Sequence, residues 1–201
     1  MKVCAAVLAS GTGTRFGGDK ISAMMGGRQV VCHAVDDLVA AGLEEIMLIV
    51  RPETVVEGLA CNGEARIVRN VHYQEGMASS IRAAVNNAGK DCDGLLLVNG
   101  DMPFFGQARY REMVAIFMSN PDSIVAATVS GVRRNPAIFP ASMMKDLLGL
   151  KGEDGGRKLL ASHSGKVVEY AVNSITAVMD IDTPQDLERA DSIFRMEGRR
   201  T

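Results

Sequence analysis

The sequence predicts an α/β fold, a three-layer sandwich in which helices cover both faces of a mostly parallel sheet. Short apolar runs alternate along the chain with segments whose apolar residues recur at helical spacing. This alternation of strands and helices is typical of parallel sheets with crossover helices. The run from Gly94 to Val98 is apolar almost without interruption, which indicates a strand buried on both faces.

The first two thirds of the chain supply most of the predicted sheet. The first strand is expected at Val3 to Leu8 and opens into a glycine-rich loop. Gly42 ends the helix that follows this loop, since glycine is favoured just past a helix end. Strands are expected at 3–8, 45–50, 65–68, 94–98 and 123–129, and helices at 30–39, 78–88 and 107–118.

Beyond residue 129 the predicted elements become shorter. The last helix begins with Thr183 as its N-cap, Pro184 at its first helical position and Asp186 bonding back to the cap. No internal repeat or linker interrupts the chain, so residues 1–201 are expected to form a single domain. The other segments are an extended piece at 135–139, a short helix at 143–148, a polar loop at 151–156 and strands at 166–171 and 177–179.

The composition argues against several classes of function. The formal net charge of the 201 residues is −2 and aromatic residues make up 4% of them, so neither a basic surface for nucleic acid nor a base-stacking platform is expected. No apolar run approaches the ~20 residues that span a bilayer. The short apolar stretch at the N-terminus runs into a charged loop without a clear cleavage site for a signal peptide. We expect a cytoplasmic protein with no membrane or nucleic-acid partner.

The four cysteines, Cys4, Cys32, Cys61 and Cys92, show no metal-binding or redox spacing. No two of them are close enough for a Cys-x-x-Cys pair. Small buried thiols in a reducing cytosol are therefore expected.

The most informative segment is the glycine-rich loop between Leu8 and Lys20. Gly11 and Gly13 allow the backbone to come close to anionic oxygens. Arg15 offers a planar fork of donors, and Lys20 a mobile point charge. A strand that opens into such a loop can hold a nucleoside triphosphate. The spacing completes neither a dinucleotide fingerprint nor a P-loop, and a degenerate dinucleotide loop or a structural turn are the alternative interpretations.

Carboxylates follow two of the other predicted strand ends, where ligands of such sheets bind. Asp101 comes after the strand at 94–98, where a carboxylate facing a phosphate loop can hold Mg²⁺. Asp180 and Asp182 alternate on an extended segment, so their side chains are expected to point to opposite faces. We choose Asp182 as the second metal ligand and expect Asp180 to point away. The alternatives are that Asp101 caps a turn and that the later pair complements a helix N-terminus.

Other polar residues carry weaker signals. Ser79 and Ser80 begin a predicted helix, where they either cap it or contact a base or ribose. His33, His72 and His163 share no ligand spacing, and no Ser/His/Asp or Cys/His set is apparent. That pattern fits metal-assisted phosphoryl chemistry, which depends on positioning and charge neutralisation more than on a covalent nucleophile.

Taken together, the motifs resemble those of the MobA-like nucleotidyltransferases, most closely the molybdenum cofactor cytidylyltransferase branch. The glycine-rich loop is similar to the first signature of that family, and the resemblance spans nearly the whole chain. The later signatures are Asn70 with Gly76 to Ile81, Gly100 to Pro103, Asn135-Pro136, Gly152 to Arg157 and Asp180 to Leu187.

The resemblance implies a Rossmann-like nucleotidyltransferase fold with a mixed sheet and a Mg²⁺-dependent reaction. The phosphate of molybdopterin would attack the α-phosphorus of CTP, so that CMP is transferred and pyrophosphate is released. The resemblance implies Lys20, Arg15 and Asp101 as catalytic residues; Leu8, Ala9, Ser10, Gly11, Gly13, Ser79 and Ser80 as nucleotide-binding residues; Asn135, Pro136, Asp154 and Arg157 as acceptor-binding residues; and Asp101 and Asp182 as metal ligands.

Two other functions fit the same motifs. GTP in place of CTP, or another sugar or cofactor phosphate as acceptor, would give a related nucleotidyltransferase. A protein that delivers the molybdenum cofactor to a molybdenum hydroxylase apo-enzyme without catalysis would belong to a different class. The presence of both Lys20 and Asp101 favours an enzyme, because a pure carrier needs neither.

Overall fold

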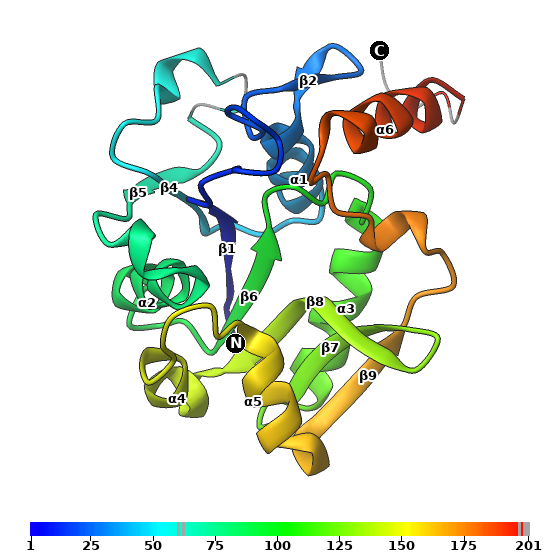
Figure 1. The fold of residues 1–201 in the computed structure, drawn as a ribbon. Coiled ribbons are helices and arrows are strands. Elements are labelled where there is room, and N and C mark those ends of the chain that lie inside the picture. Colours follow the sequence, from blue (N-terminus) through cyan, green and yellow to red (C-terminus); the bar gives the residue numbers. More distant parts are fainter. Residues whose placement is uncertain (60, 62, 197, 199–201) are drawn as a thin grey trace.

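The computed structural model describes residues 1–59, 61, 63–196 and 198. Within these residues a seven-stranded sheet has the order β5-β4-β1-β6-β8-β7-β9 (Figure 1). The strands are β1 (Val3–Ala9), β4 (Ile46–Val50), β5 (Arg66–Arg69), β6 (Gly94–Asn99), β7 (Ile124–Val129), β8 (Val132–Pro140) and β9 (Val167–Ala171), and a separate hairpin is formed by β2 (Met24–Met25) and β3 (Arg28–Gln29). The α-helices are α1 (Val30–Ala40), α2 (Met77–Asn87), α3 (Gln107–Ser119), α4 (Met144–Leu148), α5 (Gly156–Ser162) and α6 (Pro184–Met196). In the described part of the chain, no helix is long and apolar enough to cross a membrane.

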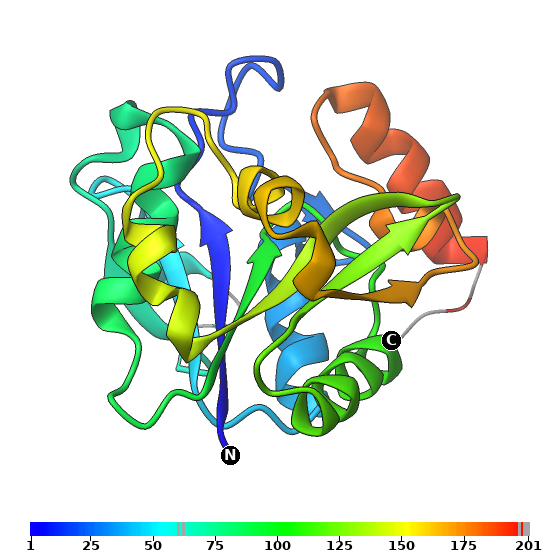
Figure 2. The ribbon, with the colours of Figure 1, turned by 90° about the horizontal axis from the view of Figure 1, so that it is seen from below.

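The sheet is mostly parallel. Strand β1 pairs in parallel with β4 and β6, β4 with β5, and β7 with β9. In Figure 2 the arrows of β1 (dark blue) and β6 (green) run in the same direction. Strand β8 is antiparallel to both β6 and β7. The predicted α/β fold with a mostly parallel mixed sheet is confirmed.

Two layers of helices cover the sheet. Alternate residues of β1 point to opposite faces, so Ala5 and Val7 pack in one apolar cluster and Cys4 and Ala6 in the other. The first cluster contains buried residues of α1 and α3, and the second those of α2, α4 and α5. All seven residues of β1 are buried, which explains why its sequence is apolar without a break. The arrangement is the predicted three-layer sandwich.

A third apolar cluster joins α6 to the β2-β3 hairpin. Phe194 of α6 lies against Gly26 in the hairpin turn, where a Cβ atom would come within 2.2 Å of the ring. Gly26 has a φ of +57°, a conformation that favours glycine. Asp191 accepts a hydrogen bond from the Gly26 N–H at 2.7 Å. Helix α6 is thus fixed to the segment that follows the glycine-rich loop.

Helix α6 begins with the predicted cap. The Asp186 N–H donates to Thr183 Oγ1 at 3.1 Å, and the Thr183 N–H donates to Asp186 Oδ2 at 2.9 Å. These reciprocal bonds satisfy N–H groups that have no partner within the helix. The Asp182 N–H also donates to Asp186 Oδ2, at 3.2 Å, so the cap holds the segment that precedes the helix.

Two predicted elements differ from the observed ones, and one observed helix was not predicted. The strand predicted at 177–179 is wrong: Thr176–Val178 forms a 3-10 helix whose apolar side chains are buried in the core without strand pairing. Helix α5 was not predicted, because its buried residues Leu159 and Leu160 are too few to reveal a period. The extended piece predicted at 135–139 is the later part of the longer strand β8.

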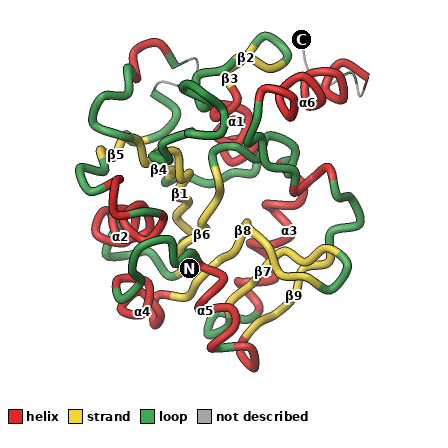
Figure 3. The backbone as a smooth tube through the Cα atoms, viewed as in Figure 1, coloured by secondary structure: helices red, strands yellow, loops and turns green. Residues whose placement is uncertain are grey.

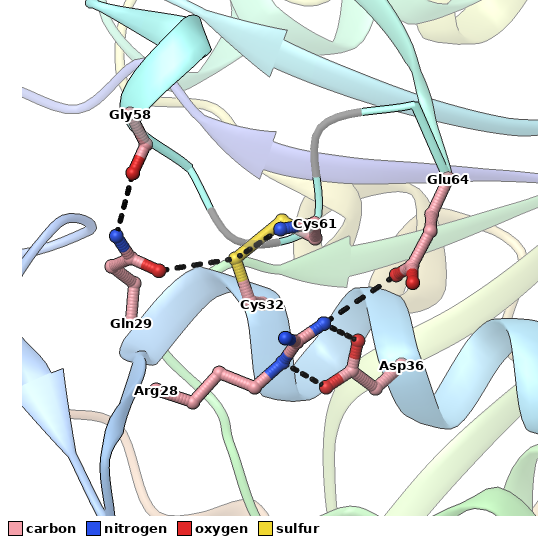
Figure 4. The surroundings of a disulfide bond; sticks show 7 residues. All are labelled: Arg28, Gln29, Cys32, Asp36, Gly58, Cys61 and Glu64. Atoms are coloured by element: carbon pink, nitrogen blue, oxygen red, sulfur yellow. Dashed lines mark hydrogen bonds and ion pairs between the residues drawn. A yellow bond between two sulfur atoms is a disulfide. The ribbon is translucent and has the colours of Figure 1, made fainter.

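The expectation that all four cysteines are free thiols is wrong for one pair. Cys32 of α1 and Cys61 form a disulfide that ties the helix to the long segment between β4 and β5, most of which is loop (Figures 3 and 4). Gln29 also binds this segment, through a hydrogen bond from its side-chain amide to the Gly58 carbonyl at 2.8 Å (Figure 4). The two cysteines are 29 positions apart, so no local motif reveals the pair. The other two cysteines are free and buried.

Candidate active site

Three loops meet at the carboxyl edge of the sheet, beside β1 and β6. Leu8 is in register with Asn99, so the two strands end at the same level. The Gly100 N–H donates to the Leu8 carbonyl at 2.9 Å, and the Ile181 N–H donates to the Asp101 carbonyl at 3.0 Å. These bonds bring together the glycine-rich loop, the corner after β6 and the segment before α6, as the sequence predicts.

A cavity of about 560 Å³ opens at this edge. Its volume lies within the range of pockets that hold small organic ligands. Its walls come from β1, the glycine-rich loop, the start of α2, the 153–157 segment and the segment before α6. The residues predicted for the site that line the cavity are Leu8, Ala9, Ser10, Gly11, Arg15, Lys20, Ser80, Asp101, Arg157 and Asp182.

Lys20 connects two of the carboxylates. Its amine donates to Asp101 Oδ2 at 2.5 Å and to Asp182 Oδ1 at 3.1 Å. The side chains of Lys20 and Asp101 are both only 16% exposed. Burial disfavours the charge on the amine, but the carboxylates outweigh it and hold the pKa of Lys20 above its usual value. Arg15 donates to Asp182 Oδ2 at 3.1 Å and is 78% exposed, so its guanidinium lies at the mouth of the cavity.

The expectation that Asp180 points away from the site is wrong. Asp180 and Asp182 both line the cavity, because residues 180–182 are not part of a regular strand, while Ile181 between them is buried against α6. Burial and the negative charge of Asp101 raise the pKa of the Asp180 carboxyl to about 6, although a hydrogen bond from Asn99 opposes this shift. The site therefore contains three carboxylates around one lysine.

The carboxylates of the site fit a magnesium ion that also binds a phosphate. Asp101 Oδ1 and Asp180 Oδ1 are buried and have no hydrogen-bond partner, so each has an oxygen free to coordinate a cation. In the described ranges no group of three or more His, Cys, Asp or Glu side chains is already arranged around a metal position. Mg²⁺ needs no such cage, because it takes one or two carboxylates and completes its shell with water and phosphate oxygens.

A buried polar cluster lies behind one wall of the cavity. The Asn70 amide nitrogen lies 2.9 Å from Ser79 Oγ, 3.2 Å from Ser10 Oγ and 3.4 Å from Ser80 Oγ. The hydroxyl oxygens of Ser10 and Ser80 are 2.6 Å apart. All four side chains are at most 6% exposed, yet Ser10 and Ser80 still face the cavity.

A second cavity, of about 360 Å³, adjoins the first. The two cavities share Leu8, Met77, Asn99, Glu153 and Arg157 as lining residues. Of the predicted acceptor-binding residues, Asn135, Asp154 and Arg157 line this second cavity, and Asp154 is engaged by Lys158 at 2.7 Å.

Three predicted site residues line neither cavity. Gly13 has a φ of +62°, and a Cβ atom there would lie 2.8 Å from the Gly18 carbonyl oxygen, so it shapes the loop. Ser79 belongs to the buried cluster and donates to the Gly76 carbonyl at 2.8 Å. Pro136 lies within β8, one residue beyond the cavity lining.

Besides Asp180, the residue-level prediction missed five polar lining residues, Thr12, Tyr73, Gln74, Asn99 and Glu153. Asn99 ends an apolar strand at the carboxyl edge, which is the signal that identified Asp101. Glu153 lies within the Gly152 to Arg157 motif, and that motif could have identified it.

A third cavity, of about 530 Å³, lies away from these residues. It is formed where α1, α3 and α6 approach the β2-β3 hairpin, and His33, Asp36, Arg109 and Phe194 are among its lining residues. None of the predicted site residues lines it, so the chemistry is assigned to the carboxyl edge of the sheet.

This fold and this site define a class of protein: an α/β protein with a cavity of nucleotide size, rich in charge, at the carboxyl ends of its central parallel strands. Within that class, the chain belongs to the family of the MobA-like NTP transferase domain, which matches residues 5–167. The predicted membership is confirmed, and with it the Rossmann-like nucleotidyltransferase fold.

Individual relatives carry several different names. The bifunctional enzyme IspD/IspF of Rhodospirillum rubrum is 27% identical over 98% of the chain, and the chain spans 58% of the length of that protein. Molybdenum cofactor guanylyltransferase of Cereibacter sphaeroides is 26% identical over 98% of the chain and 100% of its own length. Among solved structures, Rv0371c of Mycobacterium tuberculosis H37Rv has a TM-score of 0.81 at 25% identity, over 96% of this chain and 99% of that one. A complex of Rv0371C with manganese has a TM-score of 0.79 at 22% identity, over 96% and 98%.

Proposed function

We propose that this protein is a Mg²⁺-dependent nucleotidyltransferase that transfers CMP from CTP to the phosphate of molybdopterin and releases pyrophosphate. The observation that carries the proposal is the contact of Lys20 with Asp101 and Asp182 in the cavity below the glycine-rich loop. A cation and carboxylates at such a loop can bind a triphosphate together with its metal ion.

The cationic side chains hold the triphosphate. Lys20 has three N–H donors, of which Asp101 and Asp182 take two, so one is left for a phosphate oxygen. Arg15, at the mouth of the cavity, can form two parallel hydrogen bonds to phosphate oxygens. Both charges would stabilise the negative charge that develops on the leaving pyrophosphate.

Asp101 and Asp182 are proposed to hold the Mg²⁺ ion, with Asp180 beside them. The unpartnered Oδ1 of Asp101 supports this assignment. The manganese complex of the structural neighbour Rv0371C supports a divalent metal in this fold. When bound, the ion neutralises charge on the phosphate oxygens and orients them.

The acceptor is proposed to bind in the adjoining cavity. An oxygen of its phosphate attacks the α-phosphorus, the bond from that phosphorus to the bridging oxygen breaks, and pyrophosphate leaves with the electron pair. Asn135, Asp154 and Arg157 line this second cavity and offer one amide, one acidic and one basic group. Arg157 lines both cavities, so it can contact the acceptor phosphate as it approaches the nucleotide.

The choice of CTP rests on the resemblance of the motifs to the cytidylyltransferase branch. GMP transfer from GTP is the second candidate, and the guanylyltransferase of Cereibacter sphaeroides favours it.

We also propose that residues 1–201 act as one domain in the cytoplasm, where nucleoside triphosphates are available.

The function is tested by incubating the protein with Mg²⁺, molybdopterin and each of CTP, GTP, ATP and UTP. We expect pyrophosphate release with CTP, and a product whose mass equals molybdopterin plus CMP less one water. Release with GTP alone would establish the second candidate. If none of the four nucleotides gave pyrophosphate release, that result would contradict the proposal.

A further inference from the structure

The buried cluster of Asn70, Ser10, Ser79 and Ser80 has a fixed hydrogen-bond direction. The His72 N–H can only donate, so the Asn70 atom that faces it at 3.1 Å is the amide oxygen. The amide nitrogen of Asn70 therefore faces the serines. The Gly76 carbonyl can only accept, so the Ser79 hydroxyl donates to it and accepts from Asn70.

This direction decides what the cavity wall offers to a ligand. The second N–H of Asn70 points to Ser10, which accepts it. Ser10 and Ser80 then share one hydrogen bond, at 2.6 Å, and either can be its donor. In the described part of the chain, the further protein partner of either hydroxyl is again the Asn70 amide, which lies 3.4 Å from Ser80 Oγ and can only donate to it. One of their two hydroxyl protons therefore remains, and both hydroxyls line the cavity.

Asn70 acts from outside the cavity. Its side chain is 3% exposed and lines a separate surface depression behind the wall, together with Ser79. A residue in this position touches no ligand in the cavity. It sets the hydrogen-bond direction of the Ser10 and Ser80 hydroxyls, which line the cavity.

We propose that Asn70 is a positioning residue that makes the Ser10–Ser80 pair a hydrogen-bond donor, so that the site selects a nucleobase with an acceptor such as a ring carbonyl oxygen. This rests on the proposed function, because it requires a nucleotide in this cavity. An aspartate at position 70 would accept a hydrogen bond from the Ser10 hydroxyl, and Ser10 would accept one from Ser80. Both hydroxyl protons would then be used in hydrogen bonds within the protein, and the wall of the cavity would lose its hydrogen-bond donor.

The test is a calorimetric titration, with Mg²⁺ and without acceptor, of CTP and of 2-thiocytidine triphosphate, whose sulfur is a poor acceptor. We expect the wild-type protein to bind CTP about tenfold more tightly than the thio analogue, the size of one good hydrogen bond. Asn70→Asp should bind CTP about tenfold more weakly and should not distinguish the two nucleotides. Asn87→Asp, the same change at an exposed position on α2, should behave like the wild type.

Three results would overturn the inference: unchanged CTP affinity in folded Asn70→Asp, equal weakening of both nucleotides with a lower Tm, or equal affinity of the wild type for both nucleotides. The last of these needs no variant, so it decides the matter even where Asn70→Asp does not fold. Failure of the wild type to bind any triphosphate would instead overturn the proposed function itself.

Discussion

Lys20 and the carboxylates around it form a charged centre whose atoms are only partly satisfied by the protein. Asp101 gives one oxygen to Lys20 and leaves the other buried and unpartnered. Buried polar groups normally find a partner, so such an atom points to a missing ligand. The sequence allowed Asp101 and Lys20 to be identified, because each lies at a strand end or in a glycine-rich loop. The direction of Asp180 could not be predicted, since it depends on the packing of Ile181 against α6.

Asp101→Asn should lower kcat by at least ~100-fold, the size of a single strong electrostatic contribution to a transition state. The variant keeps the shape of the side chain but loses its negative charge. Pyrophosphate release measures the effect, and Asp122→Asn at an exposed turn serves as control. Full activity in Asp101→Asn would rule out the assigned role.

Lys20→Ala should weaken the binding of CTP by roughly 10- to 100-fold, because a charge-assisted hydrogen bond is worth about 1.5–3 kcal/mol. Calorimetry measures the affinity. Lys145→Ala, at an exposed position of α4, should leave it unchanged. Equal CTP affinities for Lys20→Ala and the wild type would show that this amine does not contact the triphosphate.

At the scale of elements, the sequence predicts best where a local rule determines the structure. The cap at Thr183 and Asp186 could be predicted because its partners are three residues apart. The strand predicted at 177–179 failed because no neighbouring strand pairs with it, and nothing in the local sequence reveals this. The cluster around Asn70 was not predicted either, since Ser10 is 60 residues away and only the folded sheet brings them together.

Thr183→Ala should destabilise the protein by about 1 kcal/mol, the usual effect of losing an N-cap side chain, and lower Tm by about 2–4 °C. Thermal unfolding monitored by circular dichroism measures this shift. Ser192→Ala, on the exposed side of the same helix, should cause no loss. Equal Tm values for the two variants would show that the cap does not hold α6.

At the scale of the whole molecule, the layered α/β fold could be predicted because apolar periodicity is a property of every element. The disulfide between Cys32 and Cys61 could not, because the pairing depends on how the segment between β4 and β5 folds over α1. The antiparallel direction of β8 could not be predicted from apolar periodicity either, because periodicity indicates which residues are buried but not the direction of a strand.

Stability should fall as the pH drops below about 6.5, and His33 should contribute to that loss. Burial lowers the pKa of His33, and the charge of Arg28 adds to this shift. The hydrogen bond of the ring nitrogen Nε2 to the Met25 carbonyl, at 3.0 Å, and the charges of Asp36 and Asp37 oppose it. A lowered pKa means that the folded state binds the proton less well than the unfolded state. The contribution of His33 is therefore complete above pH 6.5 and is lost as the pH falls through its folded pKa.

Urea unfolding at pH 7.5 and pH 5.0 measures this effect. The decrease in unfolding free energy between the two values should be smaller in His33→Gln than in the wild type. His72→Gln, at a side chain that is 69% exposed, is the control and should match the wild type. A decrease in His33→Gln as large as that of the wild type would contradict the assignment.

The central claim is that Lys20 and Asp101 bind the same metal-bearing triphosphate from neighbouring strand ends. Anomalous diffraction from crystals grown with Mn²⁺ and a non-hydrolysable CTP analogue tests it most directly. We predict one anomalous peak in coordination with Asp101 and a phosphate oxygen, with the Lys20 amine on the same triphosphate. A nucleotide in another cavity, or a triphosphate that neither residue touches, would contradict the claim.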